Sequence, residues 1–170
     1  MAAKPKDILW APWRLEYIKK GGEKGCIFCQ KLKDRDGLGN LVLYRGRKCF
    51  VMLNLYPYNN GHLMIVPFKH IGAWEKLDEV TTCEMIELSQ KMMVILKRTM
   101  CPHGFNMGMN SGRVGGAGVI GHAHIHLVPR WTGDNNFMPV TGGTKVISQS
   151  LAQAYQLLKK EIIKSGLNGR

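Results

Sequence analysis

The segment Gly121–Pro129, with the sequence GHAHIHLVP, constrains this chain more than any other feature. It places His122, His124 and His126 at every second position of a short apolar run. Because successive side chains of a β-strand point to opposite faces, an extended segment here would present three imidazoles on one face and apolar residues to the core. Three imidazoles are costly to bury without partners, so the pattern indicates a functional site.

Two kinds of chemistry fit three such imidazoles. All three could bind one metal ion, which would need a further ligand or an open water position, and Asp134 is the nearest acidic residue along the chain. Alternatively, one imidazole attacks phosphorus while its neighbours fix its tautomer and stabilise charge.

The loop before the histidines favours phosphorus chemistry. It carries six glycines, at positions 108, 112, 115, 116, 118 and 121. Glycines let backbone amides approach an anion closely, so we expect the loop to hold phosphate beside the imidazoles, with Gly116 and Gly118 among the contacts. The spacing matches neither a P-loop nor a GxGxxG dinucleotide fingerprint.

Strand-forming runs around one long helical segment predict a single α+β domain over 26–170, built on an antiparallel sheet of about five strands. The expected strands cover residues 41–44, 50–53, 62–67, 105–109 and 123–129. Apolar residues spaced by three or four predict a helix over 74–100 and a C-terminal helix over 146–164. Residues 1–25 are expected to form an arm that its two tryptophans dock.

Composition narrows the partners and the compartment. Lys and Arg outnumber Asp and Glu by 24 to 12, giving a formal charge of +12 that favours anionic partners. A polyphosphate metabolite fits better than nucleic acid, because the cations are scattered and the aromatic residues gather in the arm. No apolar run approaches the roughly 20 residues of a membrane span. The N-terminus has no signal peptide pattern and the cysteines number five, so we expect a reduced cytoplasmic protein.

These residues together resemble the histidine triad (HIT) family. The resemblance extends beyond the triad to Leu53-Asn54, the Gly61–Pro67 strand, the glycine-rich loop and Val128–Arg130, in the order and spacing of that family. It covers roughly residues 26–131. The arm segment Trp10–Arg14 and the tail Trp131–Val140 further resemble a bacterial branch of diadenosine tetraphosphate phosphorylases.

The resemblance implies a role for each of several residues. His124 would be the nucleophile that forms a nucleotidyl-histidine intermediate. His126 would hydrogen-bond the phosphate or the bridging oxygen, and His62 would orient His124. Asn54 would contact the ribose, and Asn110 would lie near the phosphates and the leaving group. The adenine pocket is expected to include Ile27, Phe28 and Leu53.

A Cys-x₂-Cys pair, Cys26 and Cys29, suits two thiolates on one tetrahedral zinc ion. The resemblance to bacterial triad proteins implies that His70 and His122 complete a closed, structural site. The alternative is two reduced cysteines packed as small apolar residues. The three other cysteines, Cys49, Cys83 and Cys101, are predicted to lie in the core.

One departure from the family pattern bears on the acceptor. Many hydrolases of the family carry Gln-Ser or Gln-Thr just before the triad, where this chain has Gly118-Val119. Loss of that donor favours inorganic phosphate over water as the acceptor. We therefore expect a phosphorylase, more than a hydrolase, of dinucleoside polyphosphates such as diadenosine tetraphosphate, without an organic cofactor.

Two further expectations follow from the same resemblance. The alternative to such an enzyme is a nucleotide-binding or signalling module with weak hydrolase activity on AMP esters or phosphoramidates. Family resemblance also implies a homodimer or higher homo-oligomer, with the long helix and a strand at the interface.

Overall fold

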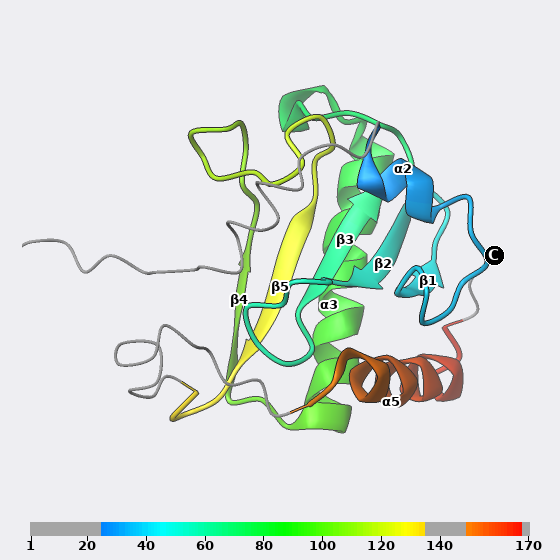
Figure 1. Cartoon of the computed structure of the whole chain (residues 1–170), viewed down its shortest axis with the longest axis vertical. Helices are drawn as coiled ribbons and strands as arrows, with labels where there is room; N and C mark the ends of the chain where they lie inside the picture. Colours follow the sequence, from blue (N-terminus) through cyan, green and yellow to red (C-terminus); the bar gives the residue numbers. More distant parts are fainter. Residues whose placement is uncertain (1–24, 135–148, 168–170) are drawn as a thin grey trace, which may run out of the picture.

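A computed structural model of the chain describes residues 25–134 and 149–167. A five-stranded sheet in the order β1-β2-β3-β5-β4 forms its centre, and every neighbouring pair is antiparallel (Figure 1). The strands are β1 (Val42–Arg45), β2 (Cys49–Leu53), β3 (Leu63–Pro67), β4 (Gly104–Gly108) and β5 (Ile125–Arg130). The predicted α+β class is confirmed. Residues 1–24 of the predicted arm and residues 135–140 of the predicted tail lie outside the described residues, so the domain boundaries stay a prediction.

The sheet is covered by helices that explain its apolar central strands. Every residue of β2 and β3 is buried, as in strands that are packed on both faces. Helix α3 (Glu79–Met100) packs against β2, β3 and β5, and α5 (Leu151–Lys164) packs against α3 and β1 (Figure 1). The short helix α2 (Ile27–Lys31) precedes β1 and contributes one buried residue, Phe28.

Both long helices begin later than the sequence predicts, because a capping side chain sets each start. Asp78 accepts a hydrogen bond from the Thr81 amide, so α3 begins at Glu79 and residues 74–76 form a separate 3₁₀ turn. Ser150 and Gln153 form a reciprocal capping box, so α5 begins at Leu151. The apolar periodicity of both segments continues across these caps and therefore could not locate them.

Strand β5 also begins later than predicted, and only His126 of the three histidines lies within it. The preceding residues run beside the segment that follows β3, where the Ala123 amide donates to the Ile71 carbonyl at 2.7 Å. The two backbones approach so closely at Gly72 that a Cβ there would collide with the Ile120 carbonyl. This contact holds the segment of the first two histidines against the end of β3.

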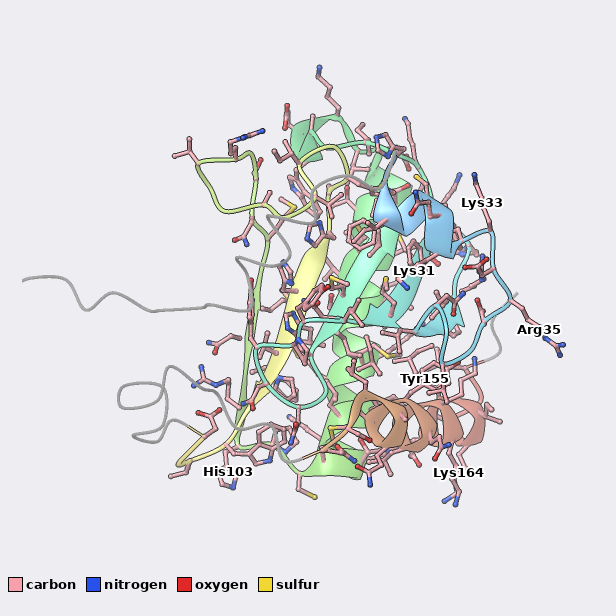
Figure 2. The ribbon with its side chains drawn as sticks, viewed as in Figure 1. Lys31, Lys33, Arg35, His103, Tyr155 and Lys164 are labelled. Atoms are coloured by element: carbon pink, nitrogen blue, oxygen red, sulfur yellow. The ribbon has the colours of Figure 1, made fainter. Side chains whose placement is uncertain are left out.

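Helix α5 closes the free edge of the sheet at β1. The Tyr155 hydroxyl points toward the sheet and donates to the Val42 carbonyl at 3.0 Å, and Lys159 Nζ donates to the Leu43 carbonyl at 2.7 Å (Figure 2). Backbone acceptors that would otherwise face solvent are thereby satisfied. No helix among the described residues combines the length and apolar character needed to cross a membrane.

Of the three cysteines outside the Cys-x₂-Cys pair, one lies in the core as predicted and two do not. Cys49 is fully buried on β2, and burial raises the pKa of its thiol to about 12. Cys83 and Cys101 are exposed, so their prediction as core residues is wrong. Cys101 is the residue at which α3 ends, in the left-handed conformation with φ 48°.

Candidate active site and metal cluster

The middle histidine of the triad has one ring nitrogen fixed by the backbone. His124 Nδ1 lies 2.8 Å from the carbonyl oxygen of His122. Because a carbonyl only accepts, Nδ1 carries the proton, and the neutral ring keeps an unprotonated Nε2. Burial lowers the pKa of His124, which favours this neutral form, and the residue is 3% exposed. The ring therefore has the tautomer that a nucleophile needs.

The third histidine contacts His62. His62 Nε2 and His126 Nδ1 lie 2.9 Å apart, and the ring of His126 lies 4.8 Å from that of His124. His62 thus contacts His126, which in turn lies beside His124, and the expectation that His62 orients His124 stays a prediction.

The turn between β2 and β3 holds His62 from the other side. The Tyr58 amide donates to His62 Nδ1 at 3.0 Å, and the tyrosine ring lies 4.8 Å from the imidazole. Asn59 Nδ2 donates to Asp134 Oδ2 at 2.7 Å, and Arg130 pairs with both oxygens of the same carboxylate. Sequence reasoning identified this segment as a turn and missed its contacts with the site.

The two asparagines that are predicted to bind nucleotide follow different strands and have different partners. Asn54 follows β2, and its Oδ1 accepts from the Tyr56 amide at 2.9 Å, which leaves its Nδ2 over the His62 ring at 3.4 and 3.5 Å from the two nitrogens. Asn110 follows β4, and its Nδ2 donates to the Gly116 carbonyl at 3.3 Å. Both roles in nucleotide binding stay predictions.

The glycine-rich loop is folded on itself. The Gly116 amide donates to the Arg113 carbonyl at 3.0 Å, and the Ala117 amide donates to the Gly112 carbonyl at 3.1 Å. In this conformation the Gly116 amide is directed into the loop. Phosphate contacts by Gly116 and Gly118 stay predictions, and that of Gly116 requires this turn to open.

The three residues that are predicted to line the adenine pocket differ in burial and in their contacts with the histidines. Phe28 is 1% exposed, and its ring centroid lies 5.0 Å from that of His124 and 5.3 Å from that of His122. Leu53 is also fully buried within the core, whereas Ile27 is half-buried on α2. Phe28 thus supports the imidazoles, and the adenine contacts of all three residues stay predictions.

The predicted metal ligands come together from three segments far apart in the sequence. Cys26, Cys29, His70 and His122 each offer a ligand atom, and these atoms all lie within 4.8 Å of one another. The Sγ to Nδ1 distances are 3.3 Å for Cys26 and His122, 3.4 Å for Cys29 and His70, and 3.8 Å for Cys29 and His122. Sulfur and nitrogen ligands on one tetrahedral zinc ion stand about 3.5 Å apart. The four residues therefore fit such an ion.

The tautomer of His122 suits metal binding. Its Nε2 lies 2.8 Å from the Pro67 carbonyl, so Nε2 carries the proton and Nδ1 presents a lone pair to the cysteines. Burial lowers the pKa of His122, and partial burial with the neighbouring Cys26 raises the pKa of the Cys29 thiol. Metal binding would therefore need loss of the thiol proton but no proton loss from His122.

The three triad histidines do not surround one ion. Among the described residues, the group that could hold a metal includes His122 but neither His124 nor His126. A ring nitrogen of His122 faces the cysteines, one of His124 faces a backbone carbonyl, and one of His126 faces His62. The tri-histidine metal site that the sequence left open does not fit this arrangement.

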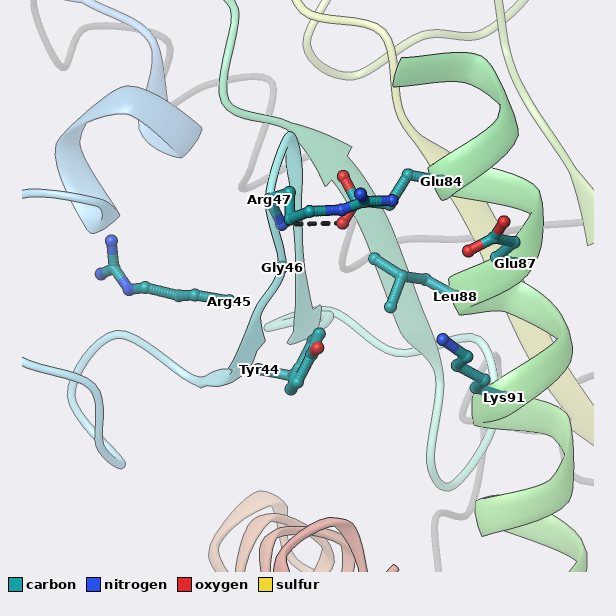
Figure 3. Close-up of a pocket in the computed structure, with 8 residues that line it drawn as sticks. All are labelled: Tyr44, Arg45, Gly46, Arg47, Glu84, Glu87, Leu88 and Lys91. Carbon is teal, nitrogen blue, oxygen red and sulfur yellow. Dashed lines mark hydrogen bonds between the residues drawn. The ribbon is translucent and has the colours of Figure 1, made fainter. Parts of the chain in front are cut away.

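A cavity of about 230 Å³ lies between the β1–β2 turn and α3, away from the predicted site residues (Figure 3). The Glu84 carboxylate accepts hydrogen bonds there from the Arg47 and Lys48 amides, and Arg45 points away from α3 toward Asp36. No residue of the histidine or cysteine clusters lines this cavity. Its charges fix the turn to the helix.

Comparison with known proteins places the chain in a family. The family model for the HIT domain matches residues 38–133, which include all five strands of the sheet and the triad. This chain belongs to the histidine triad family. The resemblance that the sequence predicts is confirmed, as is the five-stranded fold.

Known histidine triad proteins cover nearly the whole chain. The AP-4-A phosphorylase of Mycobacterium tuberculosis is 38% identical over 164 residues, which are 90% of this chain and 83% of that protein. A zinc-bound histidine triad family protein from Mycobacterium smegmatis has the same fold, with a TM-score of 0.68 and 20% identity over 86% of this chain and 99% of that one. A hypothetical histidine triad nucleotide-binding protein from Sulfolobus tokodaii has a TM-score of 0.64 and 28% identity, over 82% of this chain and 91% of that one. The chain is accordingly an enzyme of this family.

Proposed function

We propose that this enzyme cleaves the phosphoanhydride of AMP-containing dinucleoside polyphosphates, such as diadenosine tetraphosphate, through an adenylyl group carried on His124. The observation that carries the proposal is the 2.8 Å contact between His124 Nδ1 and the His122 carbonyl. It leaves the lone pair of the ring on Nε2, and a neutral imidazole is a competent nucleophile near pH 7.

The reaction would proceed in two displacements. In the first, a bond forms between His124 Nε2 and the α-phosphorus while the bond from that phosphorus to the bridging oxygen breaks. Both electrons of the broken bond leave with the polyphosphate nucleotide. In the second, an oxygen of the acceptor attacks the same phosphorus and the imidazole leaves, regaining its lone pair. Covalent transfer thereby divides one difficult displacement into two easier ones.

Inorganic phosphate is the proposed acceptor. The chain has Gly118-Val119 where many hydrolases of the family carry a polar pair, and its 38% identical relative is named AP-4-A phosphorylase. With phosphate as acceptor, diadenosine tetraphosphate gives ADP and ATP. With water it gives AMP and ATP, so the product identifies the acceptor.

Zinc is the proposed occupant of the cysteine and histidine cluster. Two sulfur and two nitrogen ligands at these separations form a closed tetrahedral set, which is typical of structural and not catalytic zinc. Bound there, the ion would tie α2 to the segment that carries His122 and His124. The proposal includes a reducing compartment such as the cytoplasm, because both thiols must stay reduced to bind.

The test is incubation of the purified chain with diadenosine tetraphosphate, with and without phosphate, followed by nucleotide separation. We expect ADP and ATP only when phosphate is present. Omitting the acceptor should leave one adenylyl group on the peptide that contains His124, detectable by mass spectrometry. Because His124 is 3% exposed, nucleotide binding must uncover Nε2, and trapping of the adenylyl group tests this requirement as well.

Two variants sharpen the test. His124→Ala should abolish both the products and the adenylylated peptide, whereas His103→Ala, which changes an exposed histidine beside Thr132, should retain them. Nucleotide binding without any turnover in the unaltered chain would overturn the proposal and favour a binding module. AMP formed equally with and without phosphate would overturn the choice of acceptor alone.

A further inference from the structure

The turn from Cys26 to Cys29 belongs both to the metal cluster and to the surroundings of His124. Cys26 precedes α2 and Cys29 lies in its first turn, and both sulfurs belong to the group of ligand atoms that lie within 4.8 Å of one another. Between the two cysteines in the sequence stands Phe28, whose buried ring lies 5.0 Å from that of His124. A change that draws the two sulfurs together therefore acts on a side chain that packs against the proposed nucleophile.

The two cysteines differ in how solvent reaches them. The contact of Cys29 with His70 is exposed, and His70 is itself an exposed residue. The contact of Cys26 with His122 is partly buried, because the His122 ring lies inside the protein. Cys29 is thus the sulfur that a small oxidant in solution reaches first, and Cys26 is close enough to react with it next.

We propose that Cys26 and Cys29 form a reversible oxidation site, at which a hydroperoxide converts the pair to a disulfide, expels zinc and displaces the contacts that hold His124. In a reducing compartment such a disulfide forms only while oxidant is present and is then reduced again. The inference rests on the proposed zinc ion and, for its effect on catalysis, on the proposed function.

The oxidation balances with hydrogen peroxide as the two-electron oxidant. The Cys29 thiolate attacks one peroxide oxygen, the O–O bond breaks, and hydroxide leaves with both electrons of that bond, so a sulfenic acid remains on Cys29. The Cys26 thiolate then attacks that sulfur, and the S–S bond forms as the S–O bond breaks and a second hydroxide leaves. Two protons from solvent convert the hydroxides to water. A thiol reductant reverses the change by exchange at the disulfide.

A disulfide and a tetrahedral zinc ion exclude each other at this pair. Two thiolates on such an ion lie about 3.8 Å apart, whereas the bonded sulfurs of a disulfide lie about 2.05 Å apart and carry no negative charge. The ion would keep only His70 and His122 of its four ligands, which is too few for a closed site. Zinc therefore leaves, and the turn that carries Phe28 must absorb the approach of the two sulfurs, about 1.7 Å.

His122 transmits the loss of zinc to His124 along a second route. Its Nδ1 faces Cys26 at 3.3 Å, and its carbonyl accepts from His124 Nδ1 at 2.8 Å. When the ion has left, the hydrogen bond from His122 Nε2 to the Pro67 carbonyl remains, but the link from His122 to α2 is lost. Both Phe28 and the His122 carbonyl contact His124, so oxidation should displace the imidazole that reacts.

Zinc release and mass spectrometry measure the oxidation independently of catalytic activity. The zinc-loaded full chain is titrated with hydrogen peroxide, and free zinc is followed with a chelating dye. We expect one zinc ion released for each disulfide formed, and a mass about 2 Da below that of the reduced chain. Peptide mapping should locate the disulfide between Cys26 and Cys29. A thiol reductant with added zinc should restore the original metal content and mass.

Two variants serve as controls for the oxidation. Cys83→Ser removes an exposed cysteine of α3, outside the cluster, and should release zinc as the unaltered chain does. Cys29→Ser should form no disulfide across the turn. If this variant fails to fold, peptide mapping of the unaltered chain and of Cys83→Ser still decides which cysteines pair.

The effect on His124 has two measurements. Imidazole ¹H–¹⁵N signals of His124 should shift on oxidation and return on reduction with zinc. Formation of ADP from diadenosine tetraphosphate should fall about ten- to a hundred-fold in the oxidised chain, because displacement of a reacting group by about 1 Å has an effect of this size. Reduction with zinc should restore this rate as well.

The outcomes separate the inference from the proposals on which it rests. Zinc that stays bound while peroxide oxidises Cys83 overturns the inference, as does zinc release without a disulfide between Cys26 and Cys29. An oxidised, zinc-free chain with unchanged His124 signals overturns the effect on the nucleophile. A chain that cannot be loaded with zinc overturns the proposed metal site. A zinc-loaded chain without turnover overturns the proposed function, while zinc release and peptide mapping still decide the oxidation site.

Discussion

Removal of zinc should destabilise the region around α2 more than any other part of the sheet and its helices. Helix α2 has five residues and no side-chain cap, so it is too short to be stable by itself. Phe28 and Ile27 pack against the core, and Asn40 Nδ2 donates to the Lys31 carbonyl at the end of the helix. At its beginning, Cys26 and Cys29 contact His122 and His70. A metal ion that joins these four residues would therefore stabilise the helix directly.

The expected size of the effect follows from how little the ligands must move. Their Sγ to Nδ1 separations, 3.3 to 3.8 Å, already bracket the roughly 3.5 Å of a tetrahedral zinc site. Little binding free energy is then spent on rearrangement. At free zinc 1,000-fold above the dissociation constant, linkage gives about 4 kcal/mol of stabilisation. For a chain of this length, that corresponds to a rise in Tm of about 8 to 16 °C.

The assay combines metal content, thermal unfolding and hydrogen exchange. We expect one zinc ion per chain, a fall in Tm of that size after chelation, and faster amide exchange in α2 and near His70. Cys29→Ser should reproduce the loss, and Cys83→Ser, at an exposed cysteine of α3, is the matched control. Two results would refute the reasoning. One is a zinc content well below one ion per chain in the parent protein as well as in both variants, and the other is a Tm that chelation changes by less than about 1 °C.

Two further predictions concern the turn and the sheet edge. The Glu84 carboxylate accepts hydrogen bonds from the Arg47 and Lys48 amides at 2.7 and 2.5 Å, and in Glu84→Gln one of these amides would face an NH₂ group. Urea unfolding should show that the free energy of unfolding falls by about 1.5 to 3 kcal/mol. The control Glu87→Gln, at an exposed residue that lines the same cavity, should change it little. Strand β4 lies at the edge of the sheet, and its Met107 is 48% exposed. If the predicted homodimer forms at this edge, Met107→Glu should reduce the mass measured by sedimentation from that of a dimer to that of a monomer. A variant that remains dimeric would exclude this edge as the interface.

Most of the fold could be predicted because local patterns and the burial pattern agree. The continuous apolar runs of β2 and β3 correspond to strands buried on both faces, and the three-to-four spacing within α3 matches its buried residues. The errors lie at element ends. Periodicity continues through Asp78 and through Ala123, whereas a side-chain cap and a backbone contact with Ile71 decide where α3 and β5 begin.

The cluster of two cysteines and two histidines was predictable for a different reason. Cysteine spacing marked two ligands, and family resemblance supplied His70 and His122, which the sheet then brings to Cys26 and Cys29. The contacts of His62 were not predictable in this way. They depend on which atoms of a turn point at the ring, and the anchor from Asn59 to Asp134 spans 75 residues. No local pattern encodes the direction of a single backbone amide.

The three histidines of the triad occupy alternate positions but have different contacts, and His122 shows why the spacing matters. Its ring faces Cys26 on one side and donates to the Pro67 carbonyl on the other, so it has no nitrogen left for phosphate. Its carbonyl, however, fixes the tautomer of His124. His122 therefore joins the proposed zinc site to the proposed nucleophile through its side chain and its backbone. A substitution of the His122 ring should consequently disturb His124 through displacement of the backbone, whereas the proposed phosphate chemistry involves the two rings that follow.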